Sequence, residues 1–191
     1  MKRAVILHGT SAQPMSGWRP WLRKKLEAEG YEVWIPALPG NDTPNREIYN
    51  NYLINSDWDF SDNIVVGHSS GAVEVLNLLD DIRCAHIKLG VCVAAWKGGL
   101  PRGYDEATNP FADFFPRSGF DFERIKSKAD HLAFMHSDND PYCPPEDATY
   151  LAEVLDAELL MKHTEYGNDA DHFGSPLTEL PELWEIIRPY L

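Results

Sequence analysis

The segment from 64 to 79 places a serine at the tip of a tight turn between a strand and a helix. An apolar run at 64–66 leads into Gly67-His68-Ser69-Ser70-Gly71, and a second apolar run follows at 72–79. Glycine has no Cβ, so the two glycines allow the strand and the helix to approach closely. We therefore predict a strand, a tight turn and a helix, with Ser69 in a strained backbone conformation at the apex.

A serine at such an apex points its hydroxyl into a cleft, as in a nucleophile elbow. Ser70 begins the helix, where its backbone N–H has no helical acceptor and can face a developing oxyanion. The first N–H groups of a helix also attract phosphate, so the same turn is compatible with phosphate binding or with a purely structural role. Partners for Ser69 elsewhere in the chain distinguish these interpretations.

Strand and helix patterns alternate along the 191 residues. The expected strands lie at 4–7, 31–36, 63–66, 87–96, 131–136 and 158–162. The expected helices lie at 17–29, 43–57, 70–82, 122–129 and 146–155, with a last helix capped by Ser175 and begun by Pro176. This alternation predicts one α/β domain, residues 1–191. We expect it to have three layers, α/β/α, in which the middle layer is a sheet of about six mostly parallel strands.

An activated serine needs a base within hydrogen-bond reach, and the base needs a carboxylate that orients it. Ligands of parallel sheets bind beyond the carboxyl ends of the strands, so both partners are expected directly after other strands. Asp138 and Asp140 follow the fifth expected strand, and Asp140 is favoured because Pro141 restricts the turn that leaves the strand. Aspartates also cap turns without any catalytic role.

Seven histidines compete for the role of base. His172 is favoured because it lies in the loop between the last strand and the last helix, and because this fold orders its residues as serine, acid and histidine. His163, at the end of the sixth expected strand, is the main rival. His86, His131 and His136 flank other strands and are weaker candidates.

The first expected strand ends in His8-Gly9-Thr10-Ser11. A strand-end His-Gly turn is similar to the loop that supplies an oxyanion-hole N–H in lipases and esterases. We predict that the Thr10 N–H joins that of Ser70 in this role, with Ser11 as the alternative donor. An ordinary glycine turn is the other interpretation of the same residues.

The segment 97–120 is rich in Gly, Pro and Phe and shows no clear period. We expect it either to form a small lid or to pack onto the core. Phe111, Phe114 and Phe115 then either line an apolar pocket or bury themselves beneath the loop. On the first interpretation Trp96, Phe111 and Phe114 contact the substrate.

The composition argues against several other classes of function. A net charge of −13 disfavours nucleic acid and anionic membranes as partners. No zinc-binding spacing, dinucleotide fingerprint or P-loop occurs, so neither a metal nor a cofactor is predicted. Three cysteines without a CxxC pair indicate reduced thiols, and the apolar run at 4–7 is too short for a signal peptide, so we expect a cytoplasmic protein.

These residues resemble the small α/β-hydrolases that include the retinoblastoma-binding serine hydrolase and its bacterial relatives. The resemblance covers most of the chain and rests on His8-Gly9-Thr10 with the Gly17-Trp18 and Trp21 region, Gly-His-Ser-Ser-Gly-Ala at 67–72, Ser-Asp-Asn-Asp-Pro at 137–141 with Pro144, and His172-Phe173. It implies a Ser69–Asp140–His172 triad and a minimal core without the two antiparallel strands that begin larger relatives. The first loop of this chain has less glycine than is usual in the family.

The combined expectation is a serine hydrolase that cleaves an ester, thioester or amide of a small molecule through an acyl-enzyme, with carboxylesterase as the first choice. One alternative is a hydrolase scaffold that binds a protein partner through the 97–120 segment or the acidic surface. A second alternative is a flavodoxin-like module that holds a phosphate at the 67–71 turn.

Overall fold

The computed structural model describes residues 1–191, which are organised around a six-stranded sheet with parallel pairing throughout. The strands are β1 (Arg3–Leu7), β2 (Glu32–Trp34), β3 (Ile64–His68), β4 (Ile87–Val93), β5 (Ala129–Ser137) and β6 (Glu158–Lys162). Their spatial order is β2-β1-β3-β4-β5-β6. The predicted parallel α/β architecture with six strands is confirmed.

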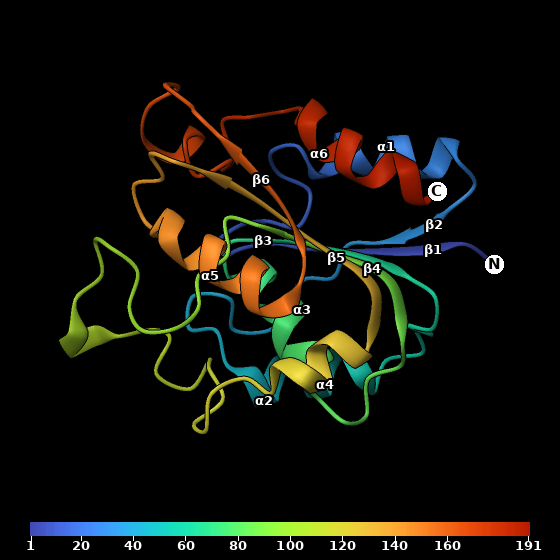
Figure 1. The fold of residues 1–191 in the computed structure, drawn as a ribbon, viewed down its shortest axis with the longest axis horizontal. Helices are drawn as coiled ribbons and strands as arrows, with labels where there is room; N and C mark the ends of the chain where they lie inside the picture. The colour runs from blue at the N-terminus through green and yellow to red at the C-terminus, as the bar shows by residue number, and fades with distance from the viewer.

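Helices cover both faces of the sheet, so the molecule has three layers (Figure 1). On one face lie α1 (Arg19–Ala28) and α6 (Pro181–Ile187). On the other face lie α2 (Arg46–Ile54), α3 (Ser70–Leu79), α4 (Phe122–Ser127) and α5 (Pro145–Leu155). Three short 3-10 helices complete the elements: η1 (Glu106–Thr108), η2 (Asn168–Ala170) and η3 (Arg188–Tyr190). No helix has both the length and the apolar character needed to cross a membrane.

The two layers of helices explain why the strands are apolar along their whole length. In β1, Ala4 and Ile6 belong to the core beneath α1 and α6, whereas Val5 and Leu7 belong to the core on the α3 side. Successive side chains of a strand point to opposite faces, and here both faces are covered. The central strands therefore read as continuous apolar runs rather than as alternating patterns.

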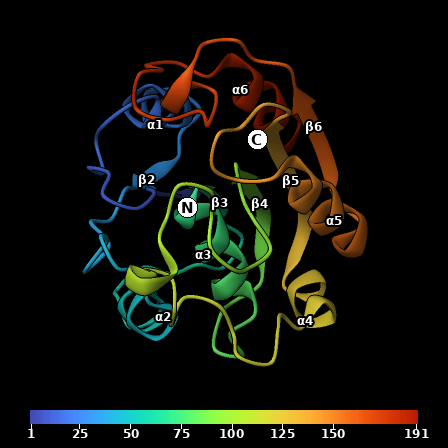
Figure 2. The ribbon, with the colours of Figure 1, turned by 90° about the vertical axis from the view of Figure 1, so that its left-hand side faces the viewer.

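The order of the strands creates one crevice at their carboxyl ends. The chain passes from β1 to β2 on one side of β1 and then returns to β3 on the other side. Loops that leave β1 and β3 therefore diverge, and ligands of open parallel sheets bind at such a point. Figure 2 views the molecule from this edge, with the segment that follows β4 near the middle.

Several expected boundaries shift for local reasons. The strand expected at 87–96 ends at Val93 because Ala94 adopts a positive φ of 56°. The second helix begins only at Arg46, because the Asn45 side chain accepts a hydrogen bond from the Ile48 N–H and caps it.

The last helix was predicted to start at Ser175-Pro176, and this prediction is wrong. The helix α6 begins at Pro181, five residues later in the chain. The Ser175 hydroxyl donates to the Asp169 carboxylate instead of accepting from a helical N–H. The proline at the first helical position is Pro181 and not Pro176.

The carboxyl group of Glu74 is buried in the middle of α3. Burial raises its pKa well above the usual value, and a hydrogen bond from Asn77 Nδ2 to Oε2, at 3.3 Å, offsets this only in part. The second oxygen, Oε1, has no hydrogen-bond partner. The folded protein therefore keeps a proton on Glu74 that the unfolded chain releases as the pH rises past 4.5.

Replacing this acid by its neutral isostere is expected to stabilise the protein in a pH-dependent way. A carboxyl whose pKa is raised by folding makes its full contribution to the free energy of unfolding below its unfolded pKa. This contribution is lost as the pH rises through the folded pKa. Glu74→Gln is therefore expected to raise the free energy of unfolding at about pH 8 but not at about pH 4, by about 1.4 kcal/mol for each unit of pKa difference.

Urea unfolding at the two pH values measures this effect, with the exposed Glu47→Gln in α2 as the control. A gain of equal size at both pH values would contradict the assignment of a proton to Glu74.

Candidate active site

Ser69 occupies the tip of the turn between β3 and α3, as the sequence predicts. Its backbone has φ 55° and ψ −123°, a conformation that residues with a side chain rarely adopt. The Ser69 N–H donates to the carbonyl of Val93 at 2.9 Å and ties the turn to the end of β4. The strained turn is thus held by the neighbouring strand, and Ser69 remains partly exposed at the edge of the sheet.

The glycines around Ser69 are required by space. A Cβ on Gly67 would lie 2.1 Å from the carbonyl oxygen of Gly71, and one on Gly71 would lie 2.4 Å from that of Leu7. A Cβ on Gly9, in the loop after β1, would lie 3.0 Å from the Cβ of Ser69. The helix α3 can therefore approach β1 and β3 only because these positions carry no side chain.

His172 and Asp140 are joined although 32 residues separate them in the chain. His172 Nδ1 donates to Asp140 Oδ2 at 2.7 Å, and Asp140 Oδ1 accepts from the N–H groups of Tyr142 (2.8 Å) and Cys143 (2.9 Å). Burial by itself would raise the pKa of Asp140, but the hydrogen bonds from His172 and from Cys143 outweigh it and leave the pKa below its usual value. The carboxylate therefore stays ionised at neutral pH.

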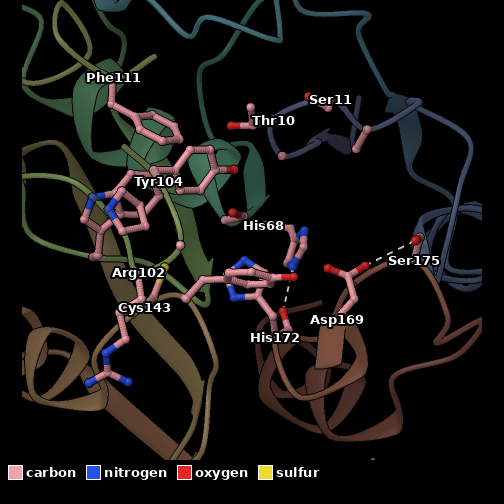
Figure 3. Close-up of a pocket in the computed structure, with 18 of the residues that line it drawn as sticks. Thr10, Ser11, His68, Arg102, Tyr104, Phe111, Cys143, Asp169, His172 and Ser175 are labelled. Carbon is pink, nitrogen blue, oxygen red and sulfur yellow. Dashed lines mark hydrogen bonds between the residues drawn. The ribbon is translucent and has the colours of Figure 1, made fainter. Parts of the chain in front are cut away.

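The loop that carries His172 is pinned by two side chains. Trp18 Nε1 donates to the carbonyl of Phe173 at 2.9 Å, and His68 Nε2 donates to that of His172 at 2.8 Å (Figure 3). Burial lowers the pKa of His68 well below its usual value, so its ring stays neutral. Phe173 has a positive φ of 55°, which turns the chain directly after His172.

These supporting roles of Trp18 and His68 were not foreseen. The sequence offered a signal, because His68 lies inside the serine turn and Trp18 inside the stretches that carry the family resemblance. Asp171 is a third support, since its carboxylate accepts from the N–H groups of Tyr166 and Gly167 and closes the start of the loop.

The rival acid and the rival histidine pair with each other at the surface. His163 Nδ1 lies 3.0 Å from the carboxylate of Asp138, and both side chains are exposed. Neither residue lines the pocket that contains Ser69. Of the other candidates, His136 is buried behind Asp140, and His86 and His131 lie outside this pocket.

The loop after β1 passes next to Ser69 and offers a free N–H at Thr10. The Ser11 N–H donates to the carbonyl of Asn41 at 3.1 Å, whereas the Thr10 N–H has no acceptor within the protein. The Ser70 N–H, at the start of α3, also has none. The Thr10 hydroxyl donates to the Ser70 hydroxyl at 2.9 Å, so the two residues lie side by side.

Ser69 and His172 line one cavity of about 510 Å³ at the carboxyl ends of the strands. Trp96 and Phe111, which we expect to contact the substrate, also line it. Figure 3 shows Phe111 and Tyr104 on one side of the cavity, with Asp169 and Ser175 across from them.

The prediction that Phe114 faces the cavity is wrong. Phe114 is fully buried and packs edge-on against Tyr49 of α2 at 5.9 Å between ring centroids, so it belongs to the core on the α3 side. Phe115 packs on the same core and also lies outside the cavity. The sequence did not distinguish these neighbouring rings because the 97–120 segment has no helical or strand period.

Asp140, Cys143 and His172 form a group with the spacing of metal ligands. Burial raises the pKa of the Cys143 thiol well above its usual value, which disfavours the thiolate that binds metals. Asp140 and His172 Nδ1 already satisfy each other. The group fits an acid–base pair better than a metal centre.

A family model described as serine hydrolase matches residues 4–180. The chain belongs to the serine hydrolase family. YdeN of Bacillus subtilis (strain 168) is 28% identical to this serine hydrolase over 194 residues, covering 99% of this chain and 96% of YdeN. The serine hydrolase RBBP9 of Rattus norvegicus is 27% identical over 192 residues, covering 99% of this chain and 95% of RBBP9. The predicted family resemblance is confirmed.

Solved structures place this serine hydrolase among proteins of the same fold. The crystal structure of the ydeN gene product from B. subtilis matches with a TM-score of 0.83 and 25% identity, over 100% of this chain and 98% of that one. The thioesterase domain from the curacin biosynthetic pathway matches with a TM-score of 0.68 and 12% identity, over 98% of this chain and 91% of that one.

Gly71→Ala is expected to destabilise the protein by about 1–3 kcal/mol, because the new Cβ overlaps the Leu7 carbonyl in a fully packed region. Gly40→Ala is the contrasting case, since Gly40 has open space around it but a positive φ of 66°, so that backbone strain without steric overlap is expected to cost about 1–2 kcal/mol there. Urea unfolding and the circular dichroism of each variant measure the difference. A Gly71→Ala protein as stable as the wild type would show that α3 can retreat from β1.

Proposed function

We propose that this serine hydrolase transfers an acyl group from a small ester, thioester or amide to water through an acyl-enzyme on Ser69. The observation that carries the proposal is the 2.7 Å hydrogen bond between His172 and Asp140 at a cavity that also contains the strained Ser69. A base with an orienting carboxylate is what a serine hydroxyl needs in order to react near neutral pH.

The proposed reaction uses Ser69 and His172, which line the cavity, and Asp140, which is bonded to His172. His172 keeps its proton on Nδ1, where the N–H donates a hydrogen bond to Asp140, and this leaves Nε2 free to accept the proton of Ser69 Oγ as the oxygen attacks the carbonyl carbon. The same proton then passes to the leaving group, and the acyl group stays on Ser69. Water, activated by His172 in the same way, releases the acid and restores the serine.

The oxyanion of each tetrahedral intermediate is proposed to bind the N–H groups of Thr10 and Ser70. Both donors are unused within the protein, and the two residues are neighbours joined through their hydroxyl groups, whereas the Ser11 N–H is occupied by Asn41. A donor that is already oriented stabilises the developing charge without reorganisation, and the loss of one such donor costs about 3 kcal/mol.

An ester is the first choice of substrate because its leaving group departs more easily than an amine. Trp96 and Phe111 supply the apolar part of the cavity wall, and residues 101–104 supply another part. These positions support the proposal that the 97–120 segment covers a bound substrate. The three cysteines are buried and unpaired, which supports a reducing, cytoplasmic location.

Ser69→Ala is expected to abolish labelling by a fluorophosphonate probe, because only an activated serine reacts with it. Ser70→Ala is the matched control, since it removes the neighbouring hydroxyl but keeps the backbone N–H, and its labelling is expected to persist. In-gel fluorescence of the purified proteins measures both. Labelling of Ser69→Ala would refute the nucleophile, and an unlabelled wild type would favour the alternative of a scaffold that binds a protein partner.

Asp140→Asn is expected to lower kcat on a p-nitrophenyl ester by about 10⁴-fold, because an amide at this position no longer holds the productive tautomer of His172. Asp138→Asn removes a carboxylate that contacts only the exposed His163, and its kcat is expected to stay within about twofold of wild type. Steady-state kinetics on the three proteins measure the contrast. A larger loss in Asp138→Asn would show that the surface pair is the functional one.

A further inference from the structure

Arg19, the first residue of α1, places a guanidinium at the cavity that contains Ser69. The residue is 2% exposed. Its Nε donates to the carbonyl of Pro14 at 3.0 Å, and its Nη2 donates to the carbonyl of Gln13 at 2.9 Å and to the hydroxyl of Ser16 at 2.6 Å. All of these acceptors are neutral, so the positive charge is oriented by the loop but is not neutralised by it.

No carboxylate compensates this buried charge. Arg46, which is only partly buried, pairs with Asp80 at 2.8 Å, but the buried Arg19 takes part in no ion pair. Burial lowers the pKa of Arg19 to about 10, and no acidic neighbour raises it again. The side chain is still charged at neutral pH, and a buried cation without an anion is costly unless a ligand supplies one.

One nitrogen of Arg19 is free to meet such a ligand. Nη1 donates to no group of the protein, and it is not among the buried polar atoms that lack a partner, so it keeps accessible surface. Because the residue lines the cavity and is otherwise enclosed, this surface faces the cavity.

No other charged residue in the cavity lining is placed to bind an anion as Arg19 is. Asp169 is the one acid in the lining, and its carboxylate accepts from Ser175 across from Tyr104 (Figure 3). Arg102 also lines the cavity, but it is exposed and Figure 3 shows its guanidinium directed away from the other labelled side chains. His68 is neutral for the reason given above. A fixed, unpaired cation therefore faces the cavity of a protein whose net charge is −13.

We infer, on the basis of the proposed acyl transfer, that Arg19 binds a carboxylate of the substrate while Ser69 attacks a separate ester carbonyl. Guanidinium N–H groups match carboxylate oxygens, and the pairing is strong where water is excluded. A single free nitrogen fits one negative charge better than a doubly charged phosphate. The preferred substrates are thus small esters that carry a free carboxylate on the acyl or the alcohol side.

Two pairs of esters test this inference on the wild-type enzyme. The first pair is p-nitrophenyl hydrogen adipate and its methyl ester, which differ only in the charge on the acyl side. The second pair is 4-acetoxybenzoic acid and its methyl ester, which carry the difference on the alcohol side. We expect kcat/KM to be at least about tenfold higher for the acid in one pair, as charge-assisted hydrogen bonds allow. No preference in either pair overturns the inference.

Substitutions then assign the preference to Arg19. Arg19→Gln also removes the hydrogen bonds to residues 13–16, so it is expected to affect both substrates, but to lower kcat/KM for the preferred acid by about tenfold more than for its methyl ester. Arg23→Gln removes the same charge from a half-buried position on the same helix, where the guanidinium pairs only with Glu27, and is expected to leave both values unchanged. Equal losses on acid and ester by a folded Arg19→Gln would make Arg19 a support of the loop only, and would overturn the inference.

Two further measurements cover the remaining outcomes. If Arg19→Gln does not fold, Arg19→Lys keeps the charge and is expected to retain the preference for the acid; its loss in a folded Arg19→Lys would count against the inference. A wild type that neither reacts with fluorophosphonate nor cleaves any ester refutes the acyl transfer itself. In that case calorimetry with adipate tests whether Arg19 binds a carboxylate. If adipate binds to the wild type but not to Arg19→Gln, the carboxylate site is supported. If adipate does not bind to the wild type, the inference is overturned.

Discussion

The close approach of α3 to β1 and β3 is the constraint on which the rest of the structure depends. No Cβ fits at Gly67 or Gly71, and the backbone of Ser69 is held in a conformation that a free chain avoids. The cost of this turn is met by the burial of every residue of α3 and by the parallel pairing of β3 with both neighbours. A rigid sheet therefore presents a serine at its edge, and the loops after β1, β5 and β6 are arranged around it.

The acid and the histidine show how a charged group is tolerated in a buried place. Asp140 accepts two backbone N–H groups and one imidazole N–H, so its ionised form is favoured despite burial. Each hydrogen bond also limits motion, because the carboxylate is tied to its own turn and His172 is tied to the carboxylate. Trp18 and His68 complete the restraint by binding carbonyls of the histidine loop. Arg19 is the contrast, since its hydrogen bonds orient the cation without supplying a counter-charge.

Short-range patterns were predicted well where one local rule dominates. The alternation of apolar runs with helical periods predicted where all six strands lie in the chain. The glycines at 67 and 71 predicted the position of the serine turn. Prediction failed where two local signals competed. Ser175-Pro176 has the composition of a helix start, but the Ser175 hydroxyl bonds to Asp169, and Pro181 begins the helix instead. Phe111 and Phe114 lie in the same stretch of sequence with no clear period, yet only Phe111 lines the cavity.

The sequence by itself determined the parallel fold, the serine turn and the order in which serine, acid and histidine follow one another. These features depend on neighbouring residues, and strand ends of a parallel sheet necessarily meet at one edge. Only the tertiary structure decided that Asp140 rather than Asp138 meets His172, that Ser11 and not Thr10 gives its N–H to Asn41, and that the charge of Arg19 has no partner. Each of these depends on contacts between residues that are distant in the chain. The geometry of such contacts is set by packing and cannot be read from the local sequence pattern.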